Sequence, residues 1–345
     1  MDTTHKILNT SAAAISELKD KSIALIVTSP PYPMIEMWDN CFSQQSKKVT
    51  EALKTKSYDL AFEEMHAVLA TVWQEMDRVL MDGGFACINI GDATRNCEGN
   101  FKLFSNHAKI IAYFSALGYS VLPDILWRKQ TNAPNKFMGS GMYPAGAYVT
   151  LEHEYILIFR KGKKREFVTE AAKLNRRASA YFWEERNLWF SDTWDFKGTT
   201  QKLKGGSSRA RSGAYPFELA YRLINMFSVK GDTVLDPFVG TGTTLAAAMA
   251  SERNSVGVEI DATLCEEMLE KVEPLKAQIN AYITTRLQKH LAFIEQQKAL
   301  GKEKFYTAAY HNFSVKTRQE VEIVIKPVEK IVKNKGELNC SSLEK

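Results

Sequence analysis

Short apolar runs along the chain, rich in β-branched residues and bounded by turn residues, predict buried strands. These runs lie at residues 23–27, 85–90, 121–127, 155–160, 233–235 and 255–259. Two consecutive prolines, Pro30 and Pro31, follow the first run closely. Since a proline lacks an amide donor and fixes its own φ, the strand cannot continue through them. We therefore expect the chain to turn outward at the carboxyl end of this strand.

Between the strand-like runs, apolar residues recur every three or four positions, as they do on one face of a helix. This spacing predicts helices over residues 60–80, 106–117, 216–229 and 244–251, and over most of the chain beyond residue 261, with a break near Pro274. From Val321 the pattern alternates like a strand and then becomes rich in lysine, for which we expect a frayed end. Because strands and helices alternate, the sequence predicts an α/β fold with a doubly wound sheet.

The chain has 345 residues, of which 45% are hydrophobic, so it can form about two domains with sizeable cores. Its five cysteines show no CxxC spacing, which favours neither a disulfide framework nor a zinc ribbon. We expect no bound metal and a reducing, cytoplasmic setting. Residues 1–21 lack the apolar centre of a signal peptide, and no apolar run approaches the ~18 residues of a membrane span.

Charge is concentrated in one segment. Residues 160–211 hold fourteen Lys and Arg against six acids, an excess larger than the +5 of the whole chain. The same segment contains Tyr181, Phe182, Trp183, Trp189, Phe190, Trp194 and Phe196. Basic residues interleaved with aromatics favour a nucleic-acid surface, although aromatics more often mark a core and charge runs a solvated face.

Residues 28–32 read Thr-Ser-Pro-Pro-Tyr and follow the first predicted strand. At its carboxyl end they would present the Ser29 hydroxyl, stiff backbone carbonyls and the Tyr32 ring. Such a group can hold a planar ring that carries an amino group, because hydroxyl and carbonyl oxygens accept hydrogen bonds from its N–H groups while the tyrosine stacks. Taken by itself, this motif is also consistent with a plain turn after a core strand.

A second motif lies in the β-turn-α-β unit at residues 234–259. Gly240 and Gly242 allow a tight turn, and the helix that follows offers free amides. Glu259 ends the next predicted strand, where a carboxylate can accept both hydroxyls of a ribose. The unit therefore predicts an adenosine-containing cofactor. Leu245 replaces the third glycine of a dinucleotide site, and the Gly-Lys-Ser/Thr of a P-loop is absent.

Together these motifs resemble those of the DNA amino-methyltransferases of bacterial restriction-modification systems. Residues 28–32 are similar to the catalytic Ser-Pro-Pro-Tyr motif, and residues 236–244 to the S-adenosylmethionine (SAM) motif. The circularly permuted motif order resembles the β group, in which the catalytic half comes first and the cofactor half last. The resemblance covers roughly residues 20–265 and includes Asn89-Ile-Gly-Asp92 and Tyr215-Pro216-Phe217. At residues 212–214, Ser-Gly-Ala stands where many relatives have His-Pro-Ala.

The resemblance implies a Rossmann-like SAM-dependent methyltransferase with a mixed sheet and an inserted target-recognition region. The implied domains are a catalytic half at 1–160, a target-recognition insert at 161–213, a SAM-binding half at 214–265 and a C-terminal helical extension and tail at 266–345.

Particular residues follow from the same resemblance. A flipped base would be held by Ser29, Pro30, Pro31 and Tyr32. SAM would be surrounded by Asp236, Phe238, Gly240, Thr241, Gly242 and Glu259, with Tyr215 and Pro216 helping. Arg176, Arg177, Arg209 and Arg211 could read guanine edges in double-stranded DNA or contact phosphates, which is the commoner role.

Serine at the first motif position resembles the enzymes that methylate N4 of cytosine, whereas aspartate is usual for N6 of adenine. We therefore expect a cytosine-N4 DNA methyltransferase, which in a restriction-modification system can have a partner endonuclease acting on the same site, and keep the adenine enzyme as the alternative. No Pro-Cys dipeptide occurs, so the nucleophile of a C5-cytosine enzyme is missing. Enzymes that methylate RNA or protein glutamine, and a non-catalytic nucleic-acid-binding module, are more remote alternatives.

Overall fold

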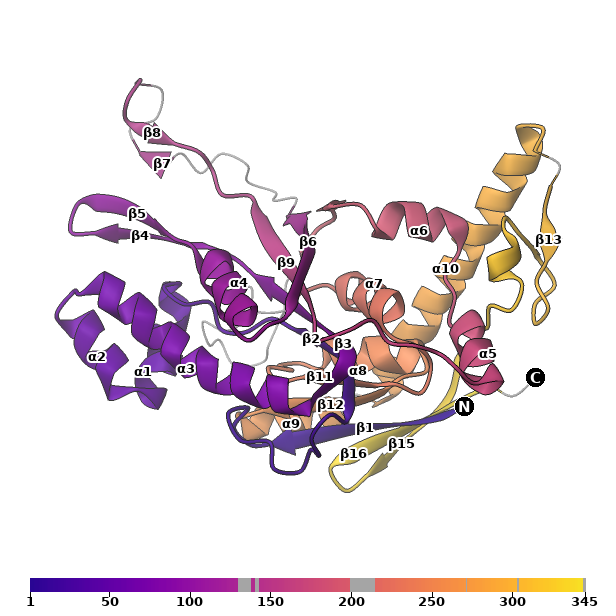
Figure 1. The fold of residues 1–345 in the computed structure, drawn as a ribbon, viewed down its shortest axis with the longest axis horizontal. Helices are drawn as coiled ribbons and strands as arrows, with labels where there is room; N and C mark the ends of the chain where they lie inside the picture. Colours follow the sequence, from indigo (N-terminus) through magenta and orange to yellow (C-terminus); the bar gives the residue numbers. More distant parts are fainter. Residues whose placement is uncertain (130–137, 140–142, 199–214, 271, 303, 344–345) are drawn as a thin grey trace.

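The computed structural model of the chain describes residues 1–129, 138–139, 143–198, 215–270, 272–302 and 304–343. A single large sheet forms its centre (Figure 1). Its strands are β1 (Asp2–Asn9), β2 (Ile23–Thr28), β3 (Leu80–Ile90), β6 (Ser120–Arg128), β9 (His153–Arg160), β10 (Thr193–Asp195), β11 (Thr233–Asp236), β12 (Asn254–Glu259), β15 (Val328–Asn334) and β16 (Glu337–Ser342). Small hairpins are formed by β4 (Ala93–Cys97) with β5 (Asn100–Phe104), β7 (Met138–Gly139) with β8 (Ala147–Tyr148), and β13 (Tyr306–Thr307) with β14 (Ser314–Val315).

The strand order across the large sheet is β10, β6, β9, β3, β2, β11, β12, β1, β16, β15. The five central strands, from β3 to β1, run parallel, and β9 and β16 join them antiparallel on either side. Every residue of β2 is buried, as its continuous apolar run requires. The predicted α/β fold with a mixed, doubly wound sheet is confirmed.

Helices cover both faces of this sheet. They are α1 (Asp39–Gln45), α2 (Lys47–Lys54), α3 (Tyr58–Val79), α4 (Asn106–Ala116), α5 (Glu170–Ala178), α6 (Trp183–Trp189), α7 (Phe217–Phe227), α8 (Thr243–Ala250), α9 (Ala262–Glu270) and α10 (Val272–Ala299), with 3-10 turns η1 (Glu36–Trp38) and η3 (Arg318–Glu320). One core cluster joins α1 to α4 to the sheet, and the other joins α7, α8 and α10. None of the helices in the described ranges is long and apolar enough to cross a membrane.

The neighbouring strands β2 and β11 lie where the connecting helices change from one face of the sheet to the other. Leu25 and Ile26 of β2 pair with Val234 and Leu235 of β11. After β2 the chain continues to α3 on one face, whereas after β11 it continues to α8 on the other. Open α/β sheets place their ligands outside the carboxyl ends of strands at such a switch point.

The two chain ends contribute further strands, of which the sequence pattern predicted only the strand-like alternation after Val321. β1 inserts between β12 and β16, and the β15–β16 hairpin forms one edge of the sheet. The expected frayed end is therefore wrong for residues 328–342. β1 was not predicted because two of its buried residues, Thr3 and His5, are polar. Its sequence therefore lacks the apolar pattern of a buried strand. The predicted break near Pro274 is displaced, because this proline lies in the first turn of α10.

Three aromatic residues of the basic segment belong to the core, whereas Trp183 and Phe190 are 42% and 39% exposed. Phe182, Trp189 and Trp194 are each at most 3% exposed and pack with residues of α7 and β9. Their interpretation as part of a nucleic-acid surface is therefore wrong. Several charges of this segment also pair within the fold, since Glu185 binds Arg286 and Arg177 binds Glu322.

A buried histidine in β1 gives the fold a predictable pH dependence. The His5 ring hydrogen-bonds Thr3 Oγ1 at 2.9 Å and Ser255 Oγ at 2.7 Å, and burial lowers its pKa from 6.5 to about 3. The unfolded chain takes up this proton below about pH 6.5 and the folded one does not, so stability present above pH 6.5 is lost as pH falls toward 3.

From His5 alone, we expect the free energy of unfolding to fall by roughly 2 kcal/mol between pH 7 and pH 5. Urea denaturation at both pH values measures this. His5→Gln should show a correspondingly smaller fall, and an equal fall in the variant would contradict the assignment.

Candidate active site

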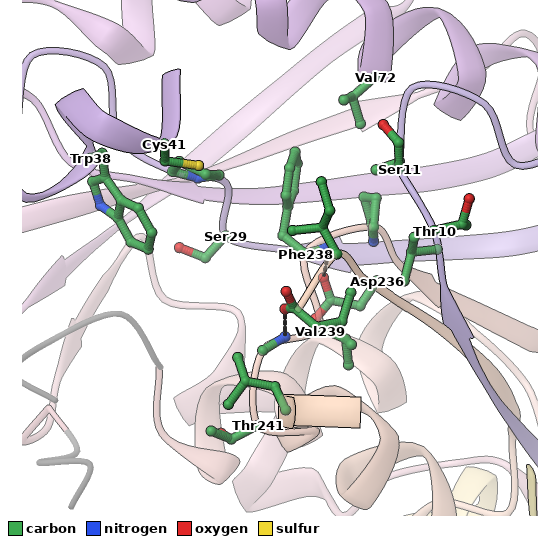
Figure 2. Close-up of a pocket in the computed structure, with 18 of the residues that line it drawn as sticks. Thr10, Ser11, Ser29, Trp38, Cys41, Val72, Asp236, Phe238, Val239 and Thr241 are labelled. Carbon is green, nitrogen blue, oxygen red and sulfur yellow. Dashed lines mark hydrogen bonds between the residues drawn. The ribbon is translucent and has the colours of Figure 1, made fainter. Parts of the chain in front are cut away.

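The loops that follow β2 and β11 leave the sheet side by side and line one pocket, with an empty volume of about 1130 Å³ that includes space open to solvent. Ser29 and Pro31 line it from the first loop, and residues 236–241 from the second. The segment after β1, the end of β12 and the η1–α1 region complete the wall. In Figure 2, Ser29 lies near Trp38 and Cys41, whereas Thr10 and Ser11 lie beyond Phe238.

Asp236, at the end of β11, joins the two loops. One carboxylate oxygen accepts hydrogen bonds from Thr28 Oγ1 at 2.6 Å and from the Phe238 amide at 3.1 Å. The other accepts from the Tyr215 hydroxyl at 2.9 Å and from Thr244 Oγ1. Burial raises the pKa of Asp236 above its usual range, and these hydrogen bonds act in the opposite direction. The side chain therefore fixes the loop after β11 against the end of β2.

The glycines after Asp236 have the conformations that the turn requires. Gly240 and Gly242 have φ values of 54° and 89°, and Gly242 is the N-cap of α8. The Gly240 amide donates to Glu259 Oε2 at 3.1 Å, the bond drawn in Figure 2, and Glu259 Oε1 accepts from the Asp261 amide at 2.9 Å. Glu259 thus lies beside the glycine turn, at the end of β12 as its place in the sequence predicted.

A second network lies behind Ser29. The Tyr32 hydroxyl is 3.0 Å from Ser29 Oγ and donates to Glu154 Oε2 at 2.9 Å. Asn89 Nδ2 donates to the same hydroxyl at 2.8 Å and to Glu154 Oε2 at 2.7 Å. Lys129 forms an ion pair with Glu154 Oε1. Burial, followed by the charge of Glu154, raises the pKa of Tyr32 well above its usual value, so this phenol stays protonated.

Gly91 explains why the Asn-Ile-Gly-Asp segment belongs to this site. A Cβ at position 91 would lie 2.9 Å from Tyr32 Cε2 and 3.3 Å from Glu154 Cγ. Any larger residue would therefore displace the tyrosine or the glutamate. The adjacent Asp92 is buried and serves α4, because it accepts from the His107 amide at 3.1 Å and pairs with the His107 ring.

The structure brings most of the predicted site residues together. The pocket is lined by Ser29, Pro31, Tyr215, Asp236, Phe238, Gly240, Thr241 and Glu259. Pro30 is buried in the first loop, and Pro216 is the N-cap of α7, directly after Tyr215. Tyr32 does not line this pocket, but its hydroxyl lies 3.0 Å from Ser29 Oγ.

The predicted DNA-contacting arginines do not gather at the pocket. Arg176 and Arg177 lie in α5, whose Asn175 binds the carbonyl of Lys230 before β11, at the amino ends of the parallel strands (Figure 1). Arg176 lies over the Phe167 ring at 5.0 Å. Arg209 and Arg211 lie outside the described residues.

Several residues of the site were missed by sequence reasoning. Thr10 and Ser11 follow the unpredicted strand β1, and Trp38 and Cys41 come from a region without strong periodicity. Glu154 was missed because it stands at the start of a predicted strand, where a single carboxylate carries no motif. Among the described residues, no group of three or more His, Cys, Asp and Glu side chains could hold a metal ion.

Comparison with known proteins identifies relatives of the whole arrangement. Residues 23–270 match the family model N6_N4_Mtase, described as DNA methylase. The Type II methyltransferase M.MthZI of Methanothermobacter thermautotrophicus is 51% identical over 325 residues, which cover 94% of this chain and 90% of the relative. M.MjaI of Methanocaldococcus jannaschii, also a Type II methyltransferase, is 49% identical over 281 residues, covering 78% of this chain and 91% of the relative.

Solved structures share the fold. TTHA0409 of Thermus thermophilus, described as a putative DNA modification methylase and solved with SAM, matches with a TM-score of 0.59 and 30% identity, covering 77% of this chain and 94% of its own. The cytosine-N4-specific PvuII DNA methyltransferase matches with a TM-score of 0.52 over 77% of this chain and 86% of its own. At 14% identity, this second likeness is one of fold alone.

Proposed function

The chain belongs to the N6/N4 family of DNA methylases and is a DNA methyltransferase, and from this premise we propose that it methylates the N4 amino group of cytosine in double-stranded DNA. The observation that carries the proposal is the place of Ser29. Its hydroxyl lines the pocket at the carboxyl end of β2, beside the loop that Asp236 and Glu259 shape for a cofactor. Serine at this motif position favours cytosine over adenine as the target.

SAM is the methyl donor in this proposal, and the residues present fit it. The glycine turn and the Glu259 carboxylate lie side by side in the pocket lining, and amides with a carboxylate suit the binding of an adenosine-containing cofactor. The residues that would hold SAM are those predicted from the sequence: Asp236, Phe238, Gly240, Thr241, Gly242 and Glu259, with Tyr215 and Pro216 supporting the loop. When bound, SAM supplies an electrophilic methyl group on a sulfonium sulfur.

The chain's own residues prepare the amino group. An exocyclic amino nitrogen is a weak nucleophile because its lone pair is delocalised into the ring. Hydrogen bonds from its N–H groups to Ser29 Oγ and the Pro30 carbonyl would favour a more tetrahedral nitrogen. Tyr32 and Pro31 would hold the flipped base. Unstacking the base from the duplex costs a few kcal/mol, which its contacts in the site offset. The methyl group passes directly to nitrogen, without a covalent enzyme intermediate, and positioning supplies most of the rate enhancement.

Biological context comes from the relatives. M.MthZI and M.MjaI are both Type II methyltransferases that this chain matches over about nine tenths of their length. We infer that the chain likewise protects cytoplasmic DNA in a restriction-modification system with a cognate endonuclease.

The domain division made from the sequence also stays our proposal: a catalytic half at 1–160, a target-recognition insert at 161–213, a SAM-binding half at 214–265 and a C-terminal extension at 266–345. In the insert, α5 and α6 pack against the rest of the fold. Target recognition therefore rests mainly on the end of the insert, of which residues 199–213 lie outside the described ranges.

Product analysis tests the proposed base. The purified protein is incubated with isotope-labelled SAM and unmethylated genomic DNA, which is then digested to nucleosides for mass spectrometry. We expect labelled N4-methylcytosine. Labelled N6-methyladenine would overturn the cytosine assignment, and label in RNA but in no DNA would overturn the choice of DNA.

A further inference from the structure

We propose that Glu154 accepts the proton that the target amino group loses on methylation, and that this proton passes through the hydroxyl groups of Ser29 and Tyr32. The proposal rests on the proposed function only in needing an amino group as the target. It applies equally to cytosine and adenine. It gives the Lys129–Glu154 ion pair a role in the reaction. If the site acted only by positioning the substrate, this pair would have no role.

The three side chains form a continuous chain of hydrogen bonds that leads away from the pocket. Ser29 Oγ is 3.0 Å from the Tyr32 hydroxyl, which is 2.9 Å from Glu154 Oε2. Both distances lie within the usual range of O–H···O hydrogen bonds. Ser29 lines the pocket, whereas the Glu154 side chain is 11% exposed and lies behind it.

The direction of each hydrogen bond follows from the chemistry of Glu154. An ionised carboxylate only accepts, so the hydrogen between Tyr32 and Glu154 must be that of the phenol. The phenol oxygen is then left as an acceptor, and it accepts from Asn89 Nδ2 at 2.8 Å and from Ser29 Oγ. Since the serine proton points to Tyr32, Ser29 Oγ keeps one lone pair for the substrate besides the one that faces Asn89 Nδ2 at 3.5 Å. Glu154 thereby makes Ser29 an acceptor for the amino group.

The same orientation provides the path for the proton. The nitrogen lone pair forms the new N–C bond while the C–S bond breaks with its electrons onto sulfur, which leaves a cationic nitrogen with one proton too many. This proton moves to Ser29 Oγ, the Ser29 proton moves to Tyr32, and the Tyr32 proton moves to Glu154. Ser29 and Tyr32 end neutral, and the carboxylate becomes a carboxylic acid.

Neighbouring groups keep this path ready for the next turnover. The ion pair with Lys129 and the hydrogen bond from Asn89 hold the Glu154 carboxylate beside the Tyr32 hydroxyl before the reaction. The Lys129 side chain is 29% exposed, so water reaches the pair and can remove the proton afterwards. The high pKa of Tyr32 keeps the phenol from losing its proton permanently.

A double-mutant cycle tests the path. Single-turnover methylation of unmethylated genomic DNA is measured for wild type, Tyr32→Phe, Glu154→Gln and the double variant. Tyr32→Phe keeps the ring and removes the hydroxyl, and Glu154→Gln keeps the size and removes the charge. Each single variant should lower the rate roughly 10- to 100-fold. The double variant should be no slower than the slower single variant, because either change breaks the same path.

The matched control is Glu152→Gln, the same substitution at an exposed glutamate two residues away, which should stay within about twofold of wild type. Calorimetric titration with SAM and melting temperatures provide readouts that do not depend on activity, and both should change little in Tyr32→Phe. A rate near wild type in Tyr32→Phe, or losses that multiply in the double variant, would overturn the proposal.

Tyr32→Phe alone decides the question if Glu154→Gln does not fold. A wild-type protein that methylates no nucleic acid would refute the proposed function instead, which separates the two failures.

Discussion

Ser29→Ala is expected to reduce methylation of DNA roughly 100- to 1,000-fold while leaving the affinity for SAM nearly unchanged. The hydroxyl contributes the acceptor that faces the amino group, and alanine cannot replace it. Its bonded partners in the fold are Tyr32 and Asn89, so the loop after β11 should keep its shape. The effect should therefore fall on the reaction step and not on cofactor binding.

Single-turnover rates and calorimetric titration with SAM measure the two quantities separately. Ser22→Ala is a matched control, because Ser22 precedes β2 as Ser29 follows it, and its exposed hydroxyl binds the Lys19 carbonyl. The control should stay within about twofold of wild type. An equal loss of rate and SAM affinity in Ser29→Ala would contradict the assigned role.

Asp236→Ala is expected to lower the free energy of unfolding by roughly 2–4 kcal/mol, because it leaves buried donors without an acceptor. The Thr28 and Thr244 hydroxyls and the Phe238 amide all lose their carboxylate partner. The same bonds position the loop that lines the pocket, so the affinity for SAM should fall at least roughly tenfold as this preorganisation is lost.

Urea denaturation and calorimetric titration with SAM measure both effects of Asp236→Ala. Asp59→Ala is a suitable control, since the Asp59 side chain is 78% exposed and its ion pair with Lys102 lies on the surface. The control should change the free energy of unfolding by less than about 1 kcal/mol. A destabilised Asp236→Ala protein that binds SAM as tightly as wild type would show that the carboxylate serves the fold alone.

The amino-acid sequence by itself determined the fold class and the two ends of the pocket. The apolar residues 23–27 and 234–235 can be buried as strands, and each strand is stopped by prolines or a glycine turn. These are local properties, so they can be read from neighbouring residues. The same local properties place Ser29, Asp236 and Glu259 at or directly after strand ends.

Tertiary structure alone decided which distant residues meet. β1 and β16 pair with each other although they lie at opposite ends of the chain, and the buried polar His5 of β1 finds its hydrogen-bond partner Ser255 in β12. Phe182, Trp189 and Trp194 are core because they pack with residues of α7 and β9.

Glu154 reaches Tyr32 because β9 lies beside β3 and Gly91 leaves room for both side chains. Pairing and packing between distant segments depend on the whole chain, and a local pattern carries no information about them. The sequence therefore predicted the groups at the pocket, and the fold decided which residues support them.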